Sequence, residues 1–252
     1  ISLTINGLPT APTVSITPDP SYTTDALTAN ASGSTDPENQ SISYSYAWEL
    51  NGVPTSYTSQ TVPSSATNKG DVWTVRVTPN DGYGEGPSGA ASITIQNSPP
   101  VISSVTITPS SGVTTSTALT CSETSSDADN DSLTIVFEWD IDGASAGTGS
   151  TLTLTPSIAS PNSVVTCTVT AEDGTDSSTD SASVNVDNSP PIVNTVTLTP
   201  DPAYTDDTMV ATASGSDSDN QTVALTYEWL VNGTPLQNGG SNTLDGTLFV
   251  KG

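Results

Sequence analysis

The sequence predicts an all-β fold, built from tandem antiparallel β-sandwich domains with a period of about 91 residues. Three observations predict it. Hydrophobic residues fall in short, β-branched, alternating runs; Asn-Gly or Asp-Gly pairs follow the most regular of these runs; and the whole pattern returns at a fixed interval. We find no segment of helical periodicity long enough to form a substantial helix. Although low hydrophobicity and high net charge are typical of disordered chains, this regular placement predicts a folded protein.

The repeat is visible in two sets of residues along the 252-residue chain. Prolines that end a Val-x-(Ile/Leu)-Thr-Pro motif are spaced 91 and 91 residues apart, at Pro18, Pro109 and Pro200. Tryptophans are spaced 91 and 90 apart, at Trp48, Trp139 and Trp229. A unit of this length matches a small independent domain rather than one turn of a solenoid. We expect the last strand of a preceding or donor repeat in 1–7, a first repeat in 8–97, a second, disulfide-bearing repeat in 98–188, and a third repeat in 189–252 that lacks its last two strands.

The strand that carries the tryptophan is the clearest element of each repeat. Apolar residues occupy every second position of 42–50, 133–141 and 223–231, which predicts one face in the core and one in solvent. Each strand runs into a hairpin turn, at Asn51-Gly52, Asp142-Gly143 and Asn232-Gly233. Further strands are expected around 14–17, 26–29, 73–78 and 92–95, and one period later.

The three repeated tryptophans, Trp48, Trp139 and Trp229, are expected to anchor the cores of the repeats. Exposed aromatic residues that stack on carbohydrate are the alternative. We expect Tyr57, Tyr83 and Trp73 to be the more exposed aromatic side chains.

The two cysteines indicate the kind of sandwich. Cys121 lies on the expected second strand and Cys167 on the penultimate one, with Trp139 between them. This order is that of an immunoglobulin-like core, in which the tryptophan packs on a disulfide between the sheets. The other repeats carry apolar residues at the cysteine positions: Ala29, Val75 and Ala211. Two free thiols are one alternative, and a catalytic cysteine is another, but the chain has no His to activate it. A disulfide would indicate an oxidising compartment.

Several motifs together resemble tandem immunoglobulin-like or PKD-like repeats of large bacterial or archaeal extracellular surface and fibre proteins. They are the Asn-Ser-Pro-Pro linkers at 97–100 and 188–191, the Asp-rich loop, the Leu-Thr-x-x-x-x-Trp strand, and the Asn-Asp-Gly or Glu-Asp-Gly turn at 80–82 or 172–174. The resemblance covers all 252 residues. It implies an immunoglobulin-like sandwich fold and a role as a spacer in adhesins, surface layers or fibres.

Composition excludes several functions. The chain has 3 Lys and Arg against 27 Asp and Glu, no His, a formal net charge of -24, and 81 Ser and Thr. So few cations cannot neutralise nucleic acid or dock on an anionic membrane. Without His, Ser-His and His-metal mechanisms lose their central residue. No apolar run is long enough to span a membrane. Paired carboxylates could serve a glycosidase, but here they recur in every repeat on turns, so we expect no enzyme.

Acidic loops recur in all three repeats, within 36–38, 127–131 and 217–219. Carboxylates at alternate positions suit Ca²⁺, which takes six to eight oxygen ligands. In an immunoglobulin-like fold this loop shares one end of the domain with the loop that carries Asp81 or Asp173 and with the incoming linker. Ca²⁺ would there brace adjacent repeats, bound by Asp127, Asp129, Asp131 and Asp173. The alternative is a solvated acidic turn, and we expect no other cofactor.

Glycosylation sequons fall at one equivalent place in the three repeats and at two other places, on Asn39, Asn130, Asn220, Asn30 and Asn232. Sequons also arise by chance in a chain so rich in Asn, Ser and Thr. A glycan on Asn130 would crowd the predicted metal loop, so these two predictions partly exclude each other.

The ends of the sequence fall out of phase with the repeats. Ile1–Asn6 matches the last strand of a repeat, as in Ser92–Gln96, and Lys251-Gly252 aligns with Lys69-Gly70. We expect either a section of a longer periodic polypeptide or a chain whose third repeat is completed by β-strand addition, with Ile1–Asn6 as donor.

The sequence predicts a non-catalytic structural repeat protein of an extracellular filament, stalk or surface layer. Its expected contacts are self-association into a fibre or contacts with neighbouring repeats of the same polypeptide. A surface adhesin that binds glycan or protein, with or without Ca²⁺, is the alternative.

Overall fold

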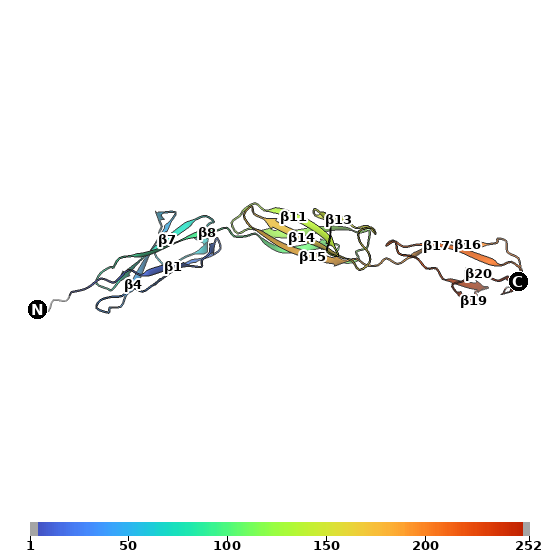
Figure 1. The fold of residues 1–252 in the computed structure, drawn as a ribbon, viewed down its shortest axis with the longest axis horizontal. Coiled ribbons are helices and arrows are strands. Elements are labelled where there is room, and N and C mark those ends of the chain that lie inside the picture. The colour runs from blue at the N-terminus through green and yellow to red at the C-terminus, as the bar shows by residue number, and fades with distance from the viewer. Residues whose placement is uncertain (1–4, 249–252) are drawn as a thin grey trace. The chain divides into compact units, whose positions relative to one another are not determined.

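The computed structural model describes residues 5–248, and these are organised mainly as β-strands and loops (Figure 1). Within this range the helical elements are two short 3₁₀ turns, η1 (Ser64–Ala66) and η2 (Gly246–Leu248). No helix among the described residues is long and apolar enough to cross a membrane. The predicted all-β fold class is confirmed. The predicted strand over Ile1–Asn6 falls largely outside the described range, as does Lys251-Gly252.

The chain forms two compact units. The first contains the residues up to Ser104 together with 124–135 and 170–179; the second contains 105–123, 136–169 and the residues from Asp180 on. In sequence terms, the first unit holds the first repeat with the acidic loop and the last hairpin loop of the second repeat. The division into three domains that the period predicts stays a prediction.

Two sheets enclose the core of the first repeat. One, in the order β1-β3-β6, consists of β1 (Thr13–Thr17), β3 (Leu27–Ser32) and β6 (Thr61–Val62). The other, in the order β2-β8-β7-β4-β5, consists of β2 (Ser21–Tyr22), β8 (Gly89–Gln96), β7 (Val72–Asn80), β4 (Ser43–Leu50) and β5 (Val53–Pro54). Neighbouring strands are antiparallel, except that β2 runs parallel to β8.

Buried side chains from both sheets of the first repeat form one core cluster. It consists of Ile16, Leu27, Ala29, Trp48, Val62, Trp73, Val75, Val77, Ile93 and Ile95. The register of β4 and β7 places Trp48 opposite Val75. In β7 every second residue is buried, beginning with Trp73, because side chains of a strand alternate between its two faces. The first repeat is therefore a β-sandwich.

The second repeat also has two sheets. One, in the order β13-β10-β9, consists of β13 (Thr151–Thr153), β10 (Ala118–Ser126) and β9 (Val101–Thr108). The other, in the order β12-β11-β14-β15, consists of β12 (Ala144–Thr148), β11 (Thr134–Ile141), β14 (Val164–Glu172) and β15 (Ser177–Asn185). A register shift between Trp139 and Asp140 interrupts the pairing of β11 with β12.

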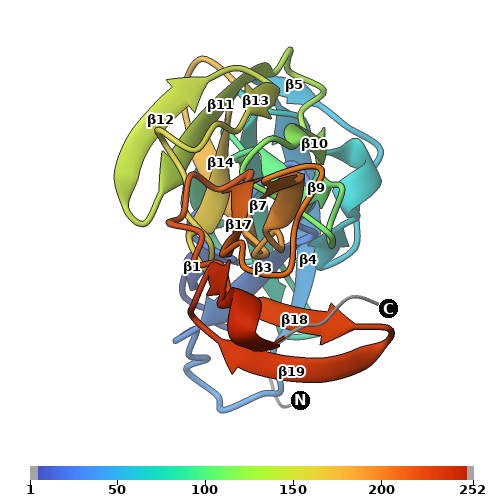
Figure 2. The same ribbon diagram turned by 90° about the vertical axis from the view of Figure 1, so that its right-hand side faces the viewer.

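The third repeat has a three-stranded and a two-stranded sheet. They are β16-β17-β20, from β16 (Ile192–Thr199), β17 (Met209–Ser216) and β20 (Thr243–Leu244), and the hairpin of β18 (Tyr227–Val231) and β19 (Thr234–Gly239), which Figure 2 shows clearly. Ala211, Trp229 and Leu244 form its small core. Leu198 on β16 is 50% exposed, whereas Ile16 and Ile107 at the same place are 6% and 5% exposed.

The predicted strand over 223–231 is only partly formed, because residues 223–226 are irregular and β18 begins at Tyr227. In the first repeat the corresponding half of β4 pairs with the end of β7, Ser43 lying opposite Asn80. Within residues 5–248, β18 has a single neighbouring strand, β19, so residues 223–226 have no strand to pair with. Burial still alternates there, since Val223 and Leu225 are half-buried.

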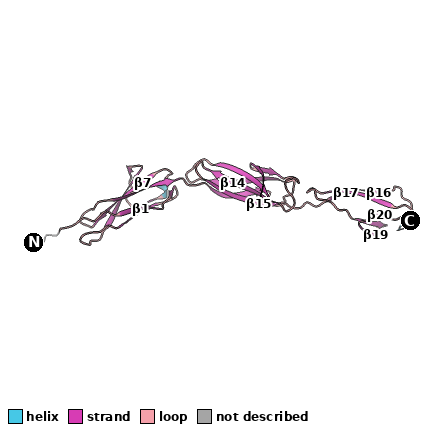
Figure 3. Ribbon diagram, in the orientation of Figure 1, coloured by secondary structure: helices cyan, strands magenta, loops and turns pink. Residues whose placement is uncertain are grey.

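The three predicted hairpin turns are confirmed by the backbone. Asn51 and Gly52 have φ of 51° and 78°, Asp142 and Gly143 have 53° and 82°, and Asn232 and Gly233 have 49° and 79°. Two successive residues of positive φ match the right-handed twist of the flanking strands. A strand precedes and follows each of these turns. Figure 3 shows the strands and the loops that join them in separate colours.

Hydroxyl side chains pair across neighbouring strands on the exposed faces of the sheets. The oxygen–oxygen distances are 2.8 Å for Thr74–Ser92, 2.8 Å for Thr78–Ser88, 2.9 Å for Thr166–Ser183 and 2.7 Å for Thr195–Ser214. Such cross-strand pairs contribute to sheet stability without adding charge.

Candidate functional site at the acidic loops

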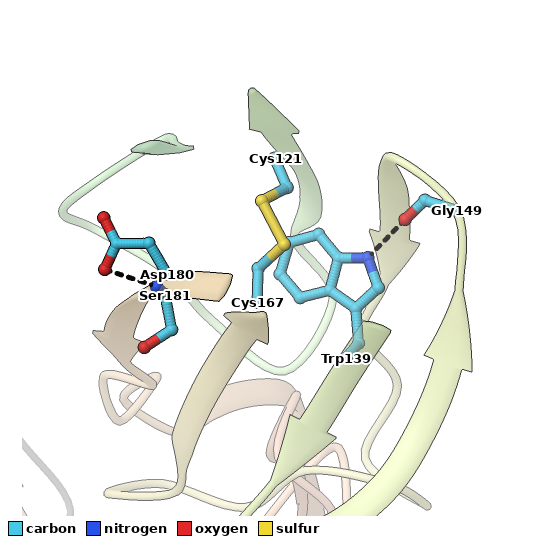
Figure 4. The surroundings of a disulfide bond; sticks show 6 residues. All are labelled: Cys121, Trp139, Gly149, Cys167, Asp180 and Ser181. Carbon is cyan, nitrogen blue, oxygen red and sulfur yellow. Dashed lines mark hydrogen bonds between the residues drawn. A yellow bond between two sulfur atoms is a disulfide. The ribbon is translucent and has the colours of Figure 1, made fainter. Parts of the chain in front are cut away.

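A disulfide joins the two sheets of the second repeat. Cys121 on β10 and Cys167 on β14 are bonded, with their Cα atoms 6.4 Å apart and both side chains buried. Figure 4 shows the Trp139 indole beside the disulfide, with its N–H donating to the Gly149 carbonyl at 2.8 Å. The predicted pairing is therefore confirmed, and it links residues 46 positions apart.

The equivalent positions in the other repeats are filled by apolar packing. Ala29 and Val75 are fully buried in the first repeat, and Ala211 is buried in the third. The indole N–H groups of Trp48 and Trp229 donate to the carbonyls of Ser59 and Ser241 at 2.9 Å and 3.3 Å. All three repeated tryptophans are buried, with at most 8% exposure.

Two of the three aromatic residues expected to be exposed are not. Trp73 is 1% exposed, because it shares the inward face of β7 with Val75. Its ring meets Trp48 edge-to-face at a centroid distance of 6.2 Å and Tyr57 at 5.8 Å. Tyr57 is therefore packed against the core as well. Tyr83 is 79% exposed.

Each acidic loop is a turn organised by its first aspartate. We use "acidic loop" for residues 36–40, 127–131 and 217–221. Asp36 Oδ1 accepts the backbone N–H groups of Glu38 at 2.9 Å and Gln40 at 3.0 Å. Asp127 Oδ1 accepts those of Asp129 at 2.8 Å and Asp131 at 3.2 Å, and Asp217 Oδ1 that of Asp219 at 2.8 Å. The repetition of the acidic loop thus has a local structural cause, since aspartate stabilises turns in this way.

The central carboxylate of the acidic loop binds the linker and the preceding repeat. Asp129 accepts the Ser98 backbone N–H at 2.6 Å and the Thr23 hydroxyl. Asp219 accepts the Ser189 N–H at 2.6 Å and the Thr115 hydroxyl at 2.6 Å. Sequence reasoning treated Asp129 as a metal ligand and missed this role, because its partner lies 106 residues away along the chain.

The carboxylate of Asp219 is held ionised by these contacts. The Thr115 hydroxyl, and then the Ser189 N–H, lower its pKa below the ordinary value of 3.8. We use "Thr-Asp-Ser contact" for this arrangement, in which an aspartate carboxylate accepts hydrogen bonds from a threonine hydroxyl and from the backbone N–H of a linker serine. The first acidic loop has a related linker contact, since Glu38 Oε2 accepts the Gly7 N–H at 3.0 Å.

The last aspartate of the second acidic loop forms an ion pair. Lys69 Nζ lies 2.5 Å from Asp131 Oδ2, and both side chains are about one-third exposed. Its hydrogen bond to Asp131 is the largest cause of the raised pKa of Lys69. An exposed pair of this kind contributes about 1 kcal/mol or less to stability.

A second loop, between the last two strands, contacts the linker asparagine. We call it the last hairpin loop; it comprises 81–84 in the first repeat and 173–176 in the second. Asn97 Nδ2 donates to Asp173 Oδ2 and Asp176 Oδ2, both at 2.8 Å. Asn6 Nδ2 donates to Asp81 Oδ2 at 2.9 Å. The asparagine contact is the largest cause of the lowered pKa of Asp173 and of Asp81.

Among the described residues, Asp127, Asp129 and Asp131 form a group that could hold a metal ion, with ligand atoms within 4.8 Å of one another. Asp173 is not part of that group. Its carboxylate instead contacts Asn97.

The sequon asparagines all have exposed side chains. Asn39, Asn130 and Asn220 have φ of 59°, 61° and 59°, in a conformation that asparagine tolerates better than most residues. Asn232 lies in a hairpin turn, and Asn30 on β3 donates to the Thr17 hydroxyl at 3.0 Å. The in-register sequons therefore also have a backbone explanation, and glycosylation stays a prediction.

Paired antiparallel sheets with buried tryptophans, and in the second repeat a disulfide between the sheets, define a protein of tandem immunoglobulin-like β-sandwich repeats. No protein-family model matches the sequence, and no curated protein matches it either.

Among solved structures, the chain is similar to a two-domain fibronectin type-III segment of chicken tenascin, at 12% identity and a TM-score of 0.35, over 71% of this chain and 99% of that one. It is also similar to the three N-terminal domains of the highly immunogenic outer capsid protein of bacteriophage RB49, at 15% identity and a TM-score of 0.29, over 82% and 69% of the two chains. A third similarity is to the FN1–FN3 domains of chicken CNTN1, at 13% identity and a TM-score of 0.29, over 72% and 68%. At these TM-scores the similarities do not assign the chain to a family.

Proposed function

We propose that the chain is a non-catalytic structural part of an extracellular or cell-surface filament, stalk or surface layer, in which successive sandwich repeats act as spacers. The Thr-Asp-Ser contact carries this proposal. It occurs with the same residue types at Thr23, Asp129 and Ser98 and again at Thr115, Asp219 and Ser189. A junction that is bonded in the same way twice suits a spacer better than a freely flexible linker would.

The chemistry of the chain supports an extracellular location. A buried disulfide persists in oxidising compartments and is rare where thiols are kept reduced. The hydroxyl-rich, cation-poor surface offers polar groups without the basic patches that attract nucleic acid. Exposed sequons, on Asn130 for example, are compatible with glycosylation, which mass spectrometry of material from the native source would detect.

Electron microscopy and light scattering of the purified chain test the filament proposal. We expect concentration-dependent assemblies with an axial spacing that corresponds to whole repeats. The substitutions Asp129→Asn and Asp219→Asn remove the Thr-Asp-Ser contact, and they should weaken assembly and broaden the distribution of filament lengths. The control substitution Asp180→Asn should have neither effect. Monodisperse monomers over a wide concentration range, for the parent chain and in the presence of Ca²⁺, would overturn the filament proposal.

An adhesin that binds glycan or protein is the second candidate. Tyr83 favours it, because this side chain is 79% exposed in the last hairpin loop of the first repeat. An exposed aromatic ring can stack on a sugar face. Glycan-array binding that Tyr83→Ala abolishes would support adhesion, and binding unaffected by that substitution would contradict this role for Tyr83.

The sequence predicts a metal ion bound by Asp127, Asp129, Asp131 and Asp173, and we propose that a divalent cation binds at this acidic loop. The grouping of the first three carboxylates supports a divalent cation there. The hydrogen bonds around them favour a different set of ligands.

A further inference from the structure

Five buried side-chain oxygens near the acidic loops have no hydrogen-bond donor. They are Asn6 Oδ1, Asp36 Oδ2 and Gln40 Oε1 in the first repeat, and Asn97 Oδ1 and Asp127 Oδ2 in the second. The two asparagines are equivalent residues one period apart, and so are the two aspartates. Buried polar atoms nearly always have a partner, so the same two unpaired acceptors in two repeats require an explanation.

The orientation of the asparagine amides is fixed by their other hydrogen bonds. Asn97 Nδ2 donates to the carboxylates of Asp173 and Asp176, both at 2.8 Å. Turning this amide over would place Oδ1 against two carboxylate oxygens, which is repulsive. Asn6 Nδ2 is fixed in the same way by Asp81. In both repeats the amide oxygen therefore faces away from the last hairpin loop and remains unpaired.

The aspartates present an unpaired charged oxygen. Asp36 is 8% exposed, and its Oδ1 already accepts two backbone N–H groups of the acidic loop. Asp127 uses its Oδ1 in the same way, so that in both residues Oδ2 is buried without a donor. Burying a carboxylate oxygen without a partner is costly. An ionised carboxylate and an amide oxygen are both acceptors, so they cannot satisfy each other.

Hydrogen bonds bring these oxygens to the same end of each repeat. Asn6 precedes Gly7, whose N–H is bound by Glu38 of the acidic loop, and the Asn6 amide is bound to Asp81 of the last hairpin loop. Asn97 precedes Ser98, whose N–H is bound by Asp129, and its amide is bound to Asp173. Each linker asparagine is thus tied to both loops, and its unpaired oxygen, which faces away from the last hairpin loop, shares this end of the repeat with the unpaired aspartate oxygen of the acidic loop.

We propose that the first and second repeats each bind one Ca²⁺ through these unpaired oxygens. In the first repeat the ligands are Asn6 Oδ1, Asp36 Oδ2 and Gln40 Oε1. In the second they are Asn97 Oδ1 and Asp127 Oδ2 with the Asp131 carboxylate. A set made only of charged and neutral oxygens suits Ca²⁺, whereas Mg²⁺ demands stricter geometry and sheds its water reluctantly.

These ligand sets differ from the sequence prediction in two ways. Asp129 is not a ligand, because one of its oxygens accepts the Ser98 N–H and the other the Thr23 hydroxyl. Asp173 is not a ligand for the same reason, since one of its oxygens accepts backbone N–H groups of its own loop and the other accepts from Asn97 Nδ2. The first repeat gains a site that the acidic pattern alone did not indicate, since Gln40 stands where the second repeat has Asp131. With two carboxylates against one, the second site should bind Ca²⁺ more tightly.

The third repeat supplies a matched control. Asp217 organises its acidic loop as the other two do, through the bond from Asp219 N–H at 2.8 Å. Its oxygens are not among the buried donorless atoms of the described residues. The linker asparagine also differs, because Asn188 Nδ2 donates to the Ser189 carbonyl at 3.1 Å. Asp217→Asn therefore changes the same residue type in the same turn without touching a proposed ligand.

Calorimetric titration of the chelator-treated full chain with CaCl₂ tests the proposal. We expect two sites in the parent chain, one in Asp36→Asn, one in Asp127→Asn, none in the double variant, and two in Asp217→Asn. Absence of Ca²⁺ binding by the parent at millimolar concentrations would overturn the proposal, as would full stoichiometry in the double variant. Circular dichroism checks that each variant is folded.

Thermal unfolding gives a second readout, because the proposal predicts the direction in which Ca²⁺ and chelator change the stability of each variant. Ca²⁺ at 100 times its dissociation constant should raise the folded-to-unfolded ratio of the parent about 100-fold per site, and should not change that of the double variant. In chelator, Asp127→Asn should be at least as stable as the parent, because it removes an unpaired buried charge. A clear loss of stability in chelator would show that Asp127 acts only as a turn residue. Since this test does not involve assembly, its failure is distinguishable from failure of the filament proposal.

Discussion

Replacing the disulfide of the second repeat by the residues of the first tests how much the cross-link stabilises the fold. The double substitution Cys121→Ala and Cys167→Val copies Ala29 and Val75, which occupy the same places in the first repeat and are fully buried there. Because both replacements are apolar and similar in size to cysteine, lost packing should be small. What is removed is mainly the constraint on the unfolded chain.

The magnitude follows from the length of the closed loop. The cysteines are 46 positions apart, for which the chain-entropy model gives a stabilisation of about 4 kcal/mol at 25 °C. For a domain of the size of one repeat, about 1 kcal/mol shifts the melting temperature by roughly 4–8 °C. The double variant should therefore lower the melting temperature of the second repeat by about 15–30 °C.

Differential scanning calorimetry with and without a thiol reductant measures this effect. The parent should lose stability in reductant and approach the double variant, whereas the double variant should be indifferent to reductant. The single substitution Cys121→Ala is the control for an unpaired, buried thiol at Cys167. A double variant within about 1 kcal/mol of the oxidised parent would refute the loop-entropy reasoning.

Three further predictions concern other features of the fold. The hydrogen-bonded carboxyls, such as Asp219, have a folded-state pKa below the unfolded value of 3.8, so the unfolded chain binds more protons. Their contribution to stability is present above the unfolded pKa and is lost as pH falls through the folded one; denaturant unfolding between pH 6 and pH 2 measures it, and Asp219→Asn should flatten the dependence. Gly143→Ala should cost about 1 kcal/mol, because Gly143 has φ of 82°, whereas Gly240→Ala, in open space, should be close to neutral in the same urea titration. Trp73→Ala should cost about 3–5 kcal/mol in unfolding free energy, and Tyr83→Ala should leave it unchanged; equal effects would contradict the burial described above.

Features set by local sequence could be predicted well. The alternation around Trp48 and the Asn51-Gly52 pair depend on residues next to each other in the chain, and both are seen in the strand and the turn. The disulfide could be predicted because the order of Cys121, Trp139 and Cys167 matches a known core.

Features set by distant partners could not be predicted. The role of Asp129 depends on Thr23, which the fold brings to it from 106 residues away. Trp73 was expected to be exposed because its own segment does not show how Trp48 and Tyr57 surround it. The shortened strand β18 has the same origin, since alternation in 223–231 cannot reveal whether a neighbouring strand is there to pair with it.

The unpaired oxygens could not be predicted from the sequence either. Asn6 and Asn97 are ordinary linker residues in the sequence, and only the hydrogen bonds of their amide nitrogens show that the oxygens face elsewhere. The acidic residues drew attention to the correct loops, but the pattern could not separate aspartates that organise a turn from those that bind a linker.

The paired hydroxyls on the sheet faces have a consequence for how the surface responds to its surroundings. Thr74 with Ser92, and Thr166 with Ser183, satisfy each other without any group that titrates between pH 2 and pH 10. Acid, salt and divalent cations should therefore alter the loops while leaving these hydroxyl pairs chemically unchanged. Each pair thus adds no charge of its own to a chain whose net charge is -24.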